Sequence, residues 1–163
     1  KAIICSNHIH ALDPLVIAAS TKRKISFLAK KDLFSSKLVA LFFKFMNVIP
    51  VHRDGNDAYT FKVSMRVLKN DGIIGLFAEG TREGKDRNLL PFKQGISMLA
   101  IKTRSVIVPA YISGEYKCRG KLHVKFGKPF CLEEYYNKTN AQMDFSAIAN
   151  NEVAPRVAEL KNS

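Results

Sequence analysis

The sequence predicts a single α/β domain in which a mostly parallel, mixed β-sheet is covered by helices. Short runs rich in Val and Ile recur along the chain, and segments with a helical period lie between them. No linker, repeat or low-complexity tract divides the 163 residues, which is the length of one ordinary domain. In such a sheet ligand sites form at the carboxyl ends of the strands, so the residues that follow each strand are the first candidates for function.

Six segments are predicted to be strands because they are short, apolar and mostly rich in β-branched residues. They are AIIC (2–5), ISFLA (25–29), VIPV (48–51), IIGLF (73–77), VIVPAYI (106–112) and LHVKF (122–126). Because strands alternate with helical segments, the sheet is expected to be largely parallel.

Three segments are predicted to be helices that pack on this sheet. Pro14, at a first helical position, begins PLVIAASTK. The segment DAYTFKVSMRVLKN has an apolar face opposite a basic one: Ala58, Phe61, Met65 and Leu68 against Lys62, Arg66 and Lys69. QGISMLAIKTR (94–104) repeats this kind of pattern.

One further helix candidate, SKLVALFFKFMN (36–47), is apolar on almost every side and is interrupted only by Lys37 and Lys44. The segment is too short to span a bilayer. It is therefore expected either to be buried in the core or to lie at an interface, in contact with a membrane or with acyl chains.

The chain carries 26 Lys and Arg against 14 Asp and Glu, which gives a formal charge of +12. Such a charge attracts phosphates, acidic lipid surfaces, acidic carrier proteins or nucleic acid. A nucleic-acid-binding module is the alternative from a different functional class. It is disfavoured because the sequence has no zinc-finger spacing, no aromatic RNA-binding block and no basic helix with a clear reading face.

Cysteine use and hydropathy bear on where the protein works. Cys5, Cys118 and Cys131 are odd in number and lack CxxC spacing, so they are interpreted as buried core thiols of a reduced, cytoplasm-facing protein. The sequence contains no membrane-spanning run and no signal peptide. It begins abruptly on a strand, and we expect a natural N-terminal segment to precede it.

The stretch CSNHIHALDP (5–14) places imidazole and carboxylate groups directly after the first predicted strand. His8 and Asp13 are five positions apart, so they meet only if the residues between them form a loop. Asp13 before Pro14 is also typical of a helix N-cap, which alone would explain both residues. The two roles are compatible, because capping leaves one carboxylate oxygen to orient His8 as a general base.

A metal site at His8, His10 and Asp13 is the other interpretation of this stretch, because His-x-His followed by Asp resembles the ligand runs of metallohydrolases. Its remaining ligands are hard to find, since His52 and His123 lie in no second ligand cluster. A metallohydrolase is therefore the second choice among enzymes, and no metal is predicted.

Two other strand ends carry candidate ligand residues. Arg53 ends VIPVHR (48–53), and LFAEGTRE (76–83) places Glu79, Gly80, Thr81 and Arg82 in a tight turn. Backbone amides at a glycine turn can converge on an anion, and a guanidinium matches phosphate oxygens bidentately. The turn is neither a P-loop nor a dinucleotide fingerprint, and no GxSxG serine elbow is present.

Taken in order, these stretches resemble the sequence blocks of the glycerolipid acyltransferases. NHIHALD (7–13) resembles their NHxxxxD (HX4D) motif, VIPVHR looks like the second block, LFAEGTRE is similar to FPEGTR, and IVPAYISG (107–114) matches the proline-bearing fourth strand. The most similar family is the 1-acyl-sn-glycerol-3-phosphate acyltransferases, and the resemblance covers residues 1 to about 130. Ala78 replaces the usual proline of the third block, and His10 takes a position often filled by serine.

The resemblance implies a glycerol-3-phosphate acyltransferase-like fold and one acyltransferase domain over residues 1–163, with an N-terminal membrane-seating segment missing. It implies that His8, oriented by Asp13, removes a proton from the free hydroxyl of 1-acyl-glycerol-3-phosphate, which attacks an acyl thioester directly and gives phosphatidic acid. The residues implied to bind or shape the substrate site are Arg53, Glu79, Gly80, Thr81, Arg82 and Pro109, with Glu79 orienting glycerol oxygens and Pro109 shaping the site.

The resemblance also sets the expected partners. They are acyl-CoA or acyl-carrier protein, lysophosphatidic acid and an anionic membrane surface at the cytoplasmic face, which would be the cell membrane in a bacterium. No cofactor and no nucleic-acid partner are expected. Another lysophospholipid or glycerol 3-phosphate is the alternative acceptor, since the same superfamily acylates these molecules.

Overall fold

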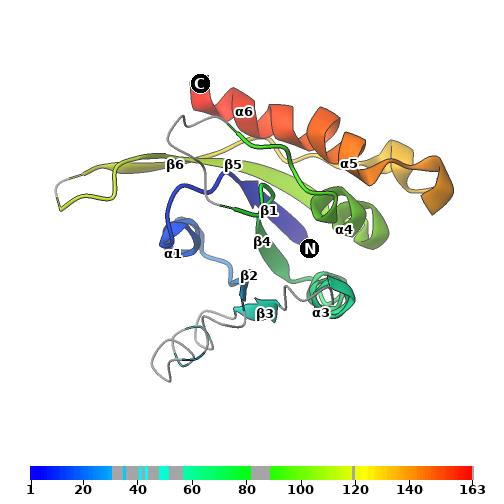
Figure 1. The fold of residues 1–163 in the computed structure, drawn as a ribbon, viewed down its shortest axis with the longest axis horizontal. Coiled ribbons are helices and arrows are strands. Elements are labelled where there is room, and N and C mark those ends of the chain that lie inside the picture. The colour runs from blue at the N-terminus through cyan, green and yellow to red at the C-terminus, as the bar shows by residue number, and fades with distance from the viewer. Residues whose placement is uncertain are drawn as a thin grey trace.

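The six predicted strands are confirmed, and they form one sheet (Figure 1). Their bounds are β1 (Ala2–Ser6), β2 (Ile25–Lys30), β3 (Ile49–Val51), β4 (Ile73–Phe77), β5 (Val106–Gly114) and β6 (Leu122–Phe126). The spatial order is β3-β2-β4-β1-β5-β6, and every pair is parallel except β5 with β6. The computed structural model describes residues 1–30, 35, 41, 43, 48–51, 57–81, 89–118 and 120–162.

The three predicted sheet-packing helices are also confirmed, as α1 (Asp13–Ala19), α3 (Asp57–Lys69) and α4 (Gly95–Thr103). Beyond the prediction, the chain ends in α5 (Phe145–Ile148), a π-helical turn (Ala149–Val153) and α6 (Ala154–Asn162). The apolar segment 36–47 lies outside the described residues, apart from Leu41 and Phe43. No helix in the described ranges is both long and apolar enough to cross a bilayer.

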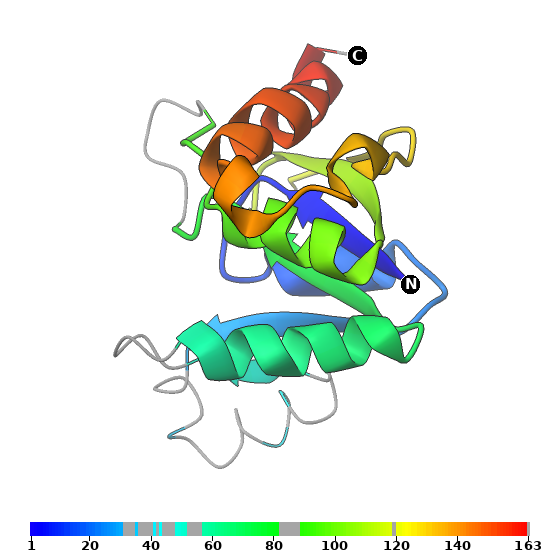
Figure 2. The ribbon, with the colours of Figure 1, turned by 90° about the vertical axis from the view of Figure 1, so that its right-hand side faces the viewer.

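The helices cover the two faces of the sheet unequally (Figure 1). One buried cluster joins Ile3 and Cys5 of β1 to α3, α4 and the C-terminal helices, which lie in front of the strands in Figure 2. The second cluster joins Ile4 of β1 to Ile17 of α1. This division follows from strand geometry, because successive side chains point to opposite faces.

One glycine in the sheet has a clear packing reason. A Cβ added to Gly75, in the middle of β4, would stand 2.2 Å from the ring of Phe27 on the neighbouring strand β2. Glycine therefore lets this buried aromatic ring approach the backbone of β4 closely.

The interpretation of all three cysteines as core thiols is wrong for two of them. Cys5 is buried in β1, and burial raises the pKa of its thiol, which keeps it protonated. Cys118 and Cys131 are exposed, because Cys118 lies in the loop between β5 and β6, among charged residues, and Cys131 lies after β6. All three are free thiols.

The register of the central strands determines which loops lie close together. β1 lies between β4 and β5, with Ser6 opposite Phe77 on one side and Ala110 on the other. The loops that follow β1 and β4 therefore leave the sheet at the same edge. β5 continues for four residues past Ala110, so the hairpin after it also reaches this edge.

Candidate active site

The predicted contact between His8 and Asp13 is present. His8 Nδ1 lies 2.7 Å from Asp13 Oδ2, and the aspartate is fully buried. An ionised carboxylate can only accept, so Nδ1 carries a proton, and in the neutral imidazole Nε2 then keeps its lone pair. The His8 side chain is 17% exposed, which leaves the imidazole accessible to a substrate. This arrangement can act as an oriented general base.

The N-cap role predicted for Asp13 is wrong. Helix α1 begins at Asp13 itself, its N-cap is Leu12, and that N-cap makes no side-chain hydrogen bond. Asp13 Oδ2 instead accepts from the backbone N–H groups of Ile9 at 2.7 Å and His10 at 2.8 Å, both upstream. The carboxylate therefore closes the loop 8–12 around itself, and this closure carries His8 into contact.

The protonation state of Asp13 follows from these contacts. Burial alone would raise the pKa of its carboxyl group, but hydrogen bonds from His8, His10, Tyr116 and Ile9 outweigh burial and hold the pKa below its usual value. Asp13 is therefore ionised at neutral pH. Its negative charge can stabilise an imidazole that becomes protonated during a reaction.

The imidazole of His8 is also fixed from its face and from its backbone. Phe77, the last residue of β4, stacks on its ring with centroids 4.2 Å apart and an interplanar angle of 20°. Glu79 Oε1 accepts from the His8 backbone N–H at 3.2 Å, and Glu79 Oε2 accepts from the Leu90 N–H at 3.0 Å. Burial raises the pKa of Glu79, although these two backbone hydrogen bonds oppose the shift. Glu79 thus ties the loop after β1 to the segment 89–93.

The side chain of Asn7 continues the hydrogen bonding between β1 and β5 just before the chain reaches His8. Its side-chain amide accepts from the Ile112 N–H at 2.7 Å and donates to the Ile112 carbonyl at 3.0 Å, and it is fully buried. Sequence reasoning missed this role of Asn7. The one signal for it was that Asn7 directly precedes His8 in the same sequence block.

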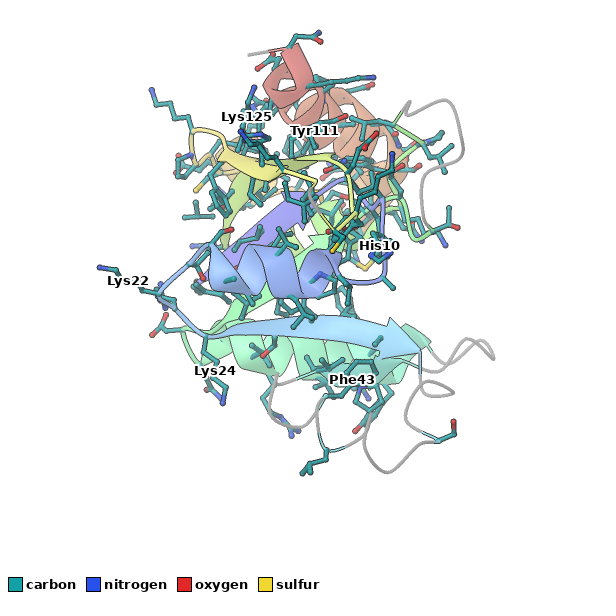
Figure 3. All side chains as sticks on the ribbon, turned by 90° about the vertical axis from the view of Figure 1, so that its left-hand side faces the viewer. His10, Lys22, Lys24, Phe43, Tyr111 and Lys125 are labelled. Atoms are coloured by element: carbon teal, nitrogen blue, oxygen red, sulfur yellow. The ribbon has the colours of Figure 1, made fainter. Side chains whose placement is uncertain are left out.

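Tyr116 is a second residue that sequence reasoning missed, and no local pattern marks it. It lies in the hairpin after β5, and its hydroxyl donates to Asp13 Oδ1 at 2.5 Å. Its ring stacks on His10 with centroids 4.0 Å apart. His10 lies at the end of the sheet toward which the arrow of β2 points (Figure 3), and its Nδ1 accepts from the Leu12 N–H at 3.2 Å.

The turn after β4 has the conformation that its glycine predicts. Gly80 has a φ of 71°, in the left-handed region, and its N–H donates to Phe77 O at 3.0 Å. A Cβ added to Gly80 would stand 2.8 Å from Lys93 Nζ, so this exposed ammonium lies over the turn. Thr81, which follows, is exposed.

Three predicted site residues remain: Pro109, Arg53 and Arg82. Pro109 is buried in β5, opposite Cys5, and its carbonyl accepts from the Gly127 N–H at 2.8 Å. It lies within the sheet, below the level of His8. Arg53 and Arg82 lie outside the described residues, so their phosphate-binding roles stay predictions.

The donor groups of the alternative metal site make other contacts. Within the described ranges, no three His, Cys, Asp or Glu side chains are grouped as metal ligands. His8 Nδ1 faces Asp13, and His10 Nδ1 accepts a backbone N–H. The described residues therefore do not form the three-ligand set that the metallohydrolase interpretation requires.

Comparisons with known proteins find a matching family, similar sequences and a similar fold. Residues 1–113 match the family model described as Acyltransferase. The chain is similar to the 1-acyl-sn-glycerol-3-phosphate acyltransferase of Bacillus subtilis, with 28% identity over 144 residues, or 85% of this chain. It is similar to the enzyme of the same name from Borreliella burgdorferi, with 36% identity over 112 residues, or 67% of this chain.

The matched part spans 70% of the Bacillus subtilis relative and 44% of the Borreliella burgdorferi relative, so the similarity to the second covers less than half of that protein. The fold matches the crystal structure of the 1-acyl-sn-glycerophosphate (LPA) acyltransferase from Thermotoga maritima, with a TM-score of 0.72 and 22% sequence identity. That match covers 100% of this chain and 67% of the other. The family model covers well over half of the sequence and includes His8, Asp13 and the turn after β4, and the chain therefore belongs to the acyltransferase family.

Proposed function

We propose that the protein transfers a fatty acyl group from a thioester to the free hydroxyl of 1-acyl-glycerol-3-phosphate, which gives phosphatidic acid for phospholipid biosynthesis. The observation that carries the proposal is the 2.7 Å hydrogen bond between His8 Nδ1 and Asp13 Oδ2, because it leaves Nε2 as a proton acceptor. The names of the relatives support this choice of acceptor.

The reaction proceeds without an acyl-enzyme. His8 Nε2 takes the proton of the acceptor hydroxyl while the hydroxyl oxygen attacks the thioester carbonyl carbon. Ionised Asp13 stabilises the imidazolium that forms. When the tetrahedral intermediate collapses, the carbon–sulfur bond breaks, and the imidazolium returns the proton to the departing thiolate. Oxygen is acylated, the thiol of CoA or carrier protein is released, and His8 is again neutral.

Phosphate binding is proposed for the basic residues at the neighbouring strand ends. Arg53 and Arg82 carry the guanidinium groups that the family pattern places there, and the turn at Gly80, whose own N–H donates to Phe77 O, leads to Thr81, which is proposed to supply a backbone amide. Lys93 supports this assignment, since its ammonium lies over Gly80. Each carboxylate oxygen of Glu79 accepts one hydrogen bond from a backbone N–H. The remaining lone pairs of Glu79 are proposed to orient glycerol oxygens.

Acyl-chain and membrane contact are proposed for the apolar surface near the site. Leu12, in the loop 8–12, is 46% exposed, and Leu90, whose N–H binds Glu79, is 37% exposed. Exposed leucines beside a polar site suit a lipid substrate. The net charge of +12 supports an anionic membrane surface at the cytoplasmic face as the place of action.

A transfer assay tests this function and selects the donor and the acceptor. Full-length protein in membranes is given radiolabelled acyl-CoA or acyl-carrier protein with lysophosphatidic acid, other lysophospholipids or glycerol 3-phosphate. We expect labelled phosphatidic acid from lysophosphatidic acid. Transfer to another acceptor in preference would replace the proposed substrate, and the absence of transfer from both donors to every acceptor would contradict the function.

A further inference from the structure

The carboxylate of Asp13 is held from two directions that are far apart in the sequence. Oδ2 accepts three hydrogen bonds from the loop 8–12, one from His8 and two from the backbone. Oδ1 accepts from the hydroxyl of Tyr116, which is 103 positions away in the sequence. In the part of the chain that the structure describes, Tyr116 is the one hydrogen-bond donor to Oδ1.

The turn after β5 places Tyr116 beside Asp13. Gly114 ends the strand with a φ of 107°, and a Cβ there would stand 2.0 Å from the Lys121 carbonyl oxygen. The hairpin is closed by hydrogen bonds from the Glu115 N–H to Lys121 O at 3.3 Å and from the Gly120 N–H to Lys117 O at 2.9 Å. A glycine-dependent turn therefore sets where the phenol lies.

The ring of Tyr116 makes a second contact with the same loop. It stacks on His10 with centroids 4.0 Å apart and an interplanar angle of 20°. Tyr116 thus touches the loop 8–12 through His10 and the carboxylate through its hydroxyl, so its position is fixed by two independent contacts. The hydroxyl stays protonated, because burial and the contact with Asp13 raise the pKa of Tyr116.

We propose that Tyr116 is a positioning residue that fixes the plane of the Asp13 carboxylate and, through it, the orientation and tautomer of the His8 imidazole. The proposal rests on the proposed function of His8 as the general base. Rotation of the carboxylate about its bond to Cβ moves both oxygens together, so the bond at Oδ1 adds to the three at Oδ2 in resisting it. Without the Tyr116 hydroxyl this restraint is weaker, and His8 loses part of its alignment. Small losses of alignment lower the rate of a reaction without weakening substrate binding.

The kinetic test compares Tyr116→Phe with Tyr59→Phe in the full-length protein. The first change keeps the ring that stacks on His10 and removes only the donor to Asp13. The second removes a hydroxyl from an exposed tyrosine on α3 and serves as the matched control. We expect kcat for acyl transfer to fall about tenfold in Tyr116→Phe, with KM for donor and acceptor within about twofold of wild type. The control variant keeps wild-type kinetics.

A spectroscopic test reads the imidazole of His8 directly and does not depend on activity. A long-range 1H–15N spectrum distinguishes the two neutral imidazole tautomers, and the His8 signals are identified by their absence in His8→Ala. Under conditions in which the imidazole is neutral, wild type and Tyr59→Phe should show the Nδ1–H tautomer, whereas Tyr116→Phe should show a mixture of the two. His8 signals that are unchanged in Tyr116→Phe would overturn the proposal.

The two readouts separate this proposal from the proposed function. If the wild-type protein transfers no acyl group, the function fails, and the tautomer measurement alone decides the role of Tyr116. If wild type is active and Tyr116→Phe retains its kcat, the positioning role is overturned and the function stands. A fall in kcat together with the change of tautomer supports both.

Discussion

Asp13 accepts four hydrogen bonds with two oxygens, and its chemistry depends on remaining ionised while buried. Because its folded-state pKa is lowered, ionised Asp13 stabilises the folded protein. The contribution is fully present above the pKa of an unfolded aspartate, about 3.9, and is lost as the pH falls through the lower folded-state value.

The first prediction concerns this stabilisation and the variant Asp13→Asn, whose amide cannot ionise. We expect the variant to unfold at a lower temperature than wild type at about pH 6, and the difference to shrink as the pH falls below about 3.9, because the unfolded wild-type chain then binds a proton more readily than the folded one. Thermal unfolding followed by circular dichroism measures both. A difference that is independent of pH would contradict the assigned ionisation of Asp13.

The second prediction concerns the two arginines of the proposed phosphate site. Arg53→Ala or Arg82→Ala should weaken acceptor use far more than donor use, since a charge-assisted contact is worth about 1.5 to 3 kcal/mol. The expected fall in kcat/KM for lysophosphatidic acid is about tenfold to a hundredfold. Wild-type acceptor kinetics in both variants would show that other residues bind the phosphate.

The strand β1 and the loop after it are joined to β5 by Asn7, so the position of His8 depends on the pairing of these two strands. The Asn7 amide takes the place of a backbone partner for Ile112. Replacing it leaves a buried N–H and a buried carbonyl without these bonds, which is costly in a protein interior.

The third prediction follows from this role of Asn7. Asn7→Ala should lower the free energy of unfolding by about 2 to 4 kcal/mol and should also reduce acyl transfer. The exposed Asn70 provides a matched control, since Asn70→Ala should change stability little. Denaturant unfolding of the two variants tests the difference; equal stabilities would mean that Asn7 does not hold the strands together.

At the scale of elements, the sequence patterns predicted the strands well because apolar β-branched runs are bounded by polar residues. They predicted the start of α1 less well: the Asp-Pro pair is typical of an N-cap, yet Asp13 turns its carboxylate back to the loop instead. The C-terminal helices were not predicted. One of their residues, Asn150, binds the backbone of Phe92 in both directions, at 2.8 and 2.9 Å, and so supports the segment that Glu79 holds.

The contacts of the site depend on separation in the sequence. His8 and Asp13 are close in the chain, so a motif of four intervening residues predicts their contact. Tyr116 and Asp13 meet only because β5 runs beside β1 and extends past it. A single tyrosine in a hairpin carries no pattern that predicts such a contact, whatever the local propensities are.

For the molecule as a whole, the positive charge is spread widely rather than confined to the site. Lys22 and Lys24 lie at the opposite end of the sheet from His10 (Figure 3). A field of this extent acts on a surface larger than one substrate, as an anionic membrane is.

The fourth prediction is that full-length protein sediments with anionic liposomes and that added salt weakens this binding. Salt shortens the reach of surface charge, to about 10 Å at 0.1 M. Neutral vesicles provide the control. Equal sedimentation with neutral and anionic vesicles at low salt would contradict an electrostatic contribution to membrane binding.

The fifth prediction tests the central claim that His8, oriented by Asp13, is the general base. His8→Ala removes the base, whereas His10→Ala removes a ring that stacks on Tyr116 but keeps the backbone N–H that binds Asp13. The most direct measurement is the rate of radiolabelled acyl transfer to lysophosphatidic acid by these two variants, with and without a metal chelator. We expect His8→Ala to lose about 10²- to 10⁴-fold in rate, His10→Ala to stay within about tenfold of wild type, and the chelator to have no effect. A folded His10→Ala protein that is as inactive as His8→Ala, together with loss of wild-type activity on chelation, would contradict the account.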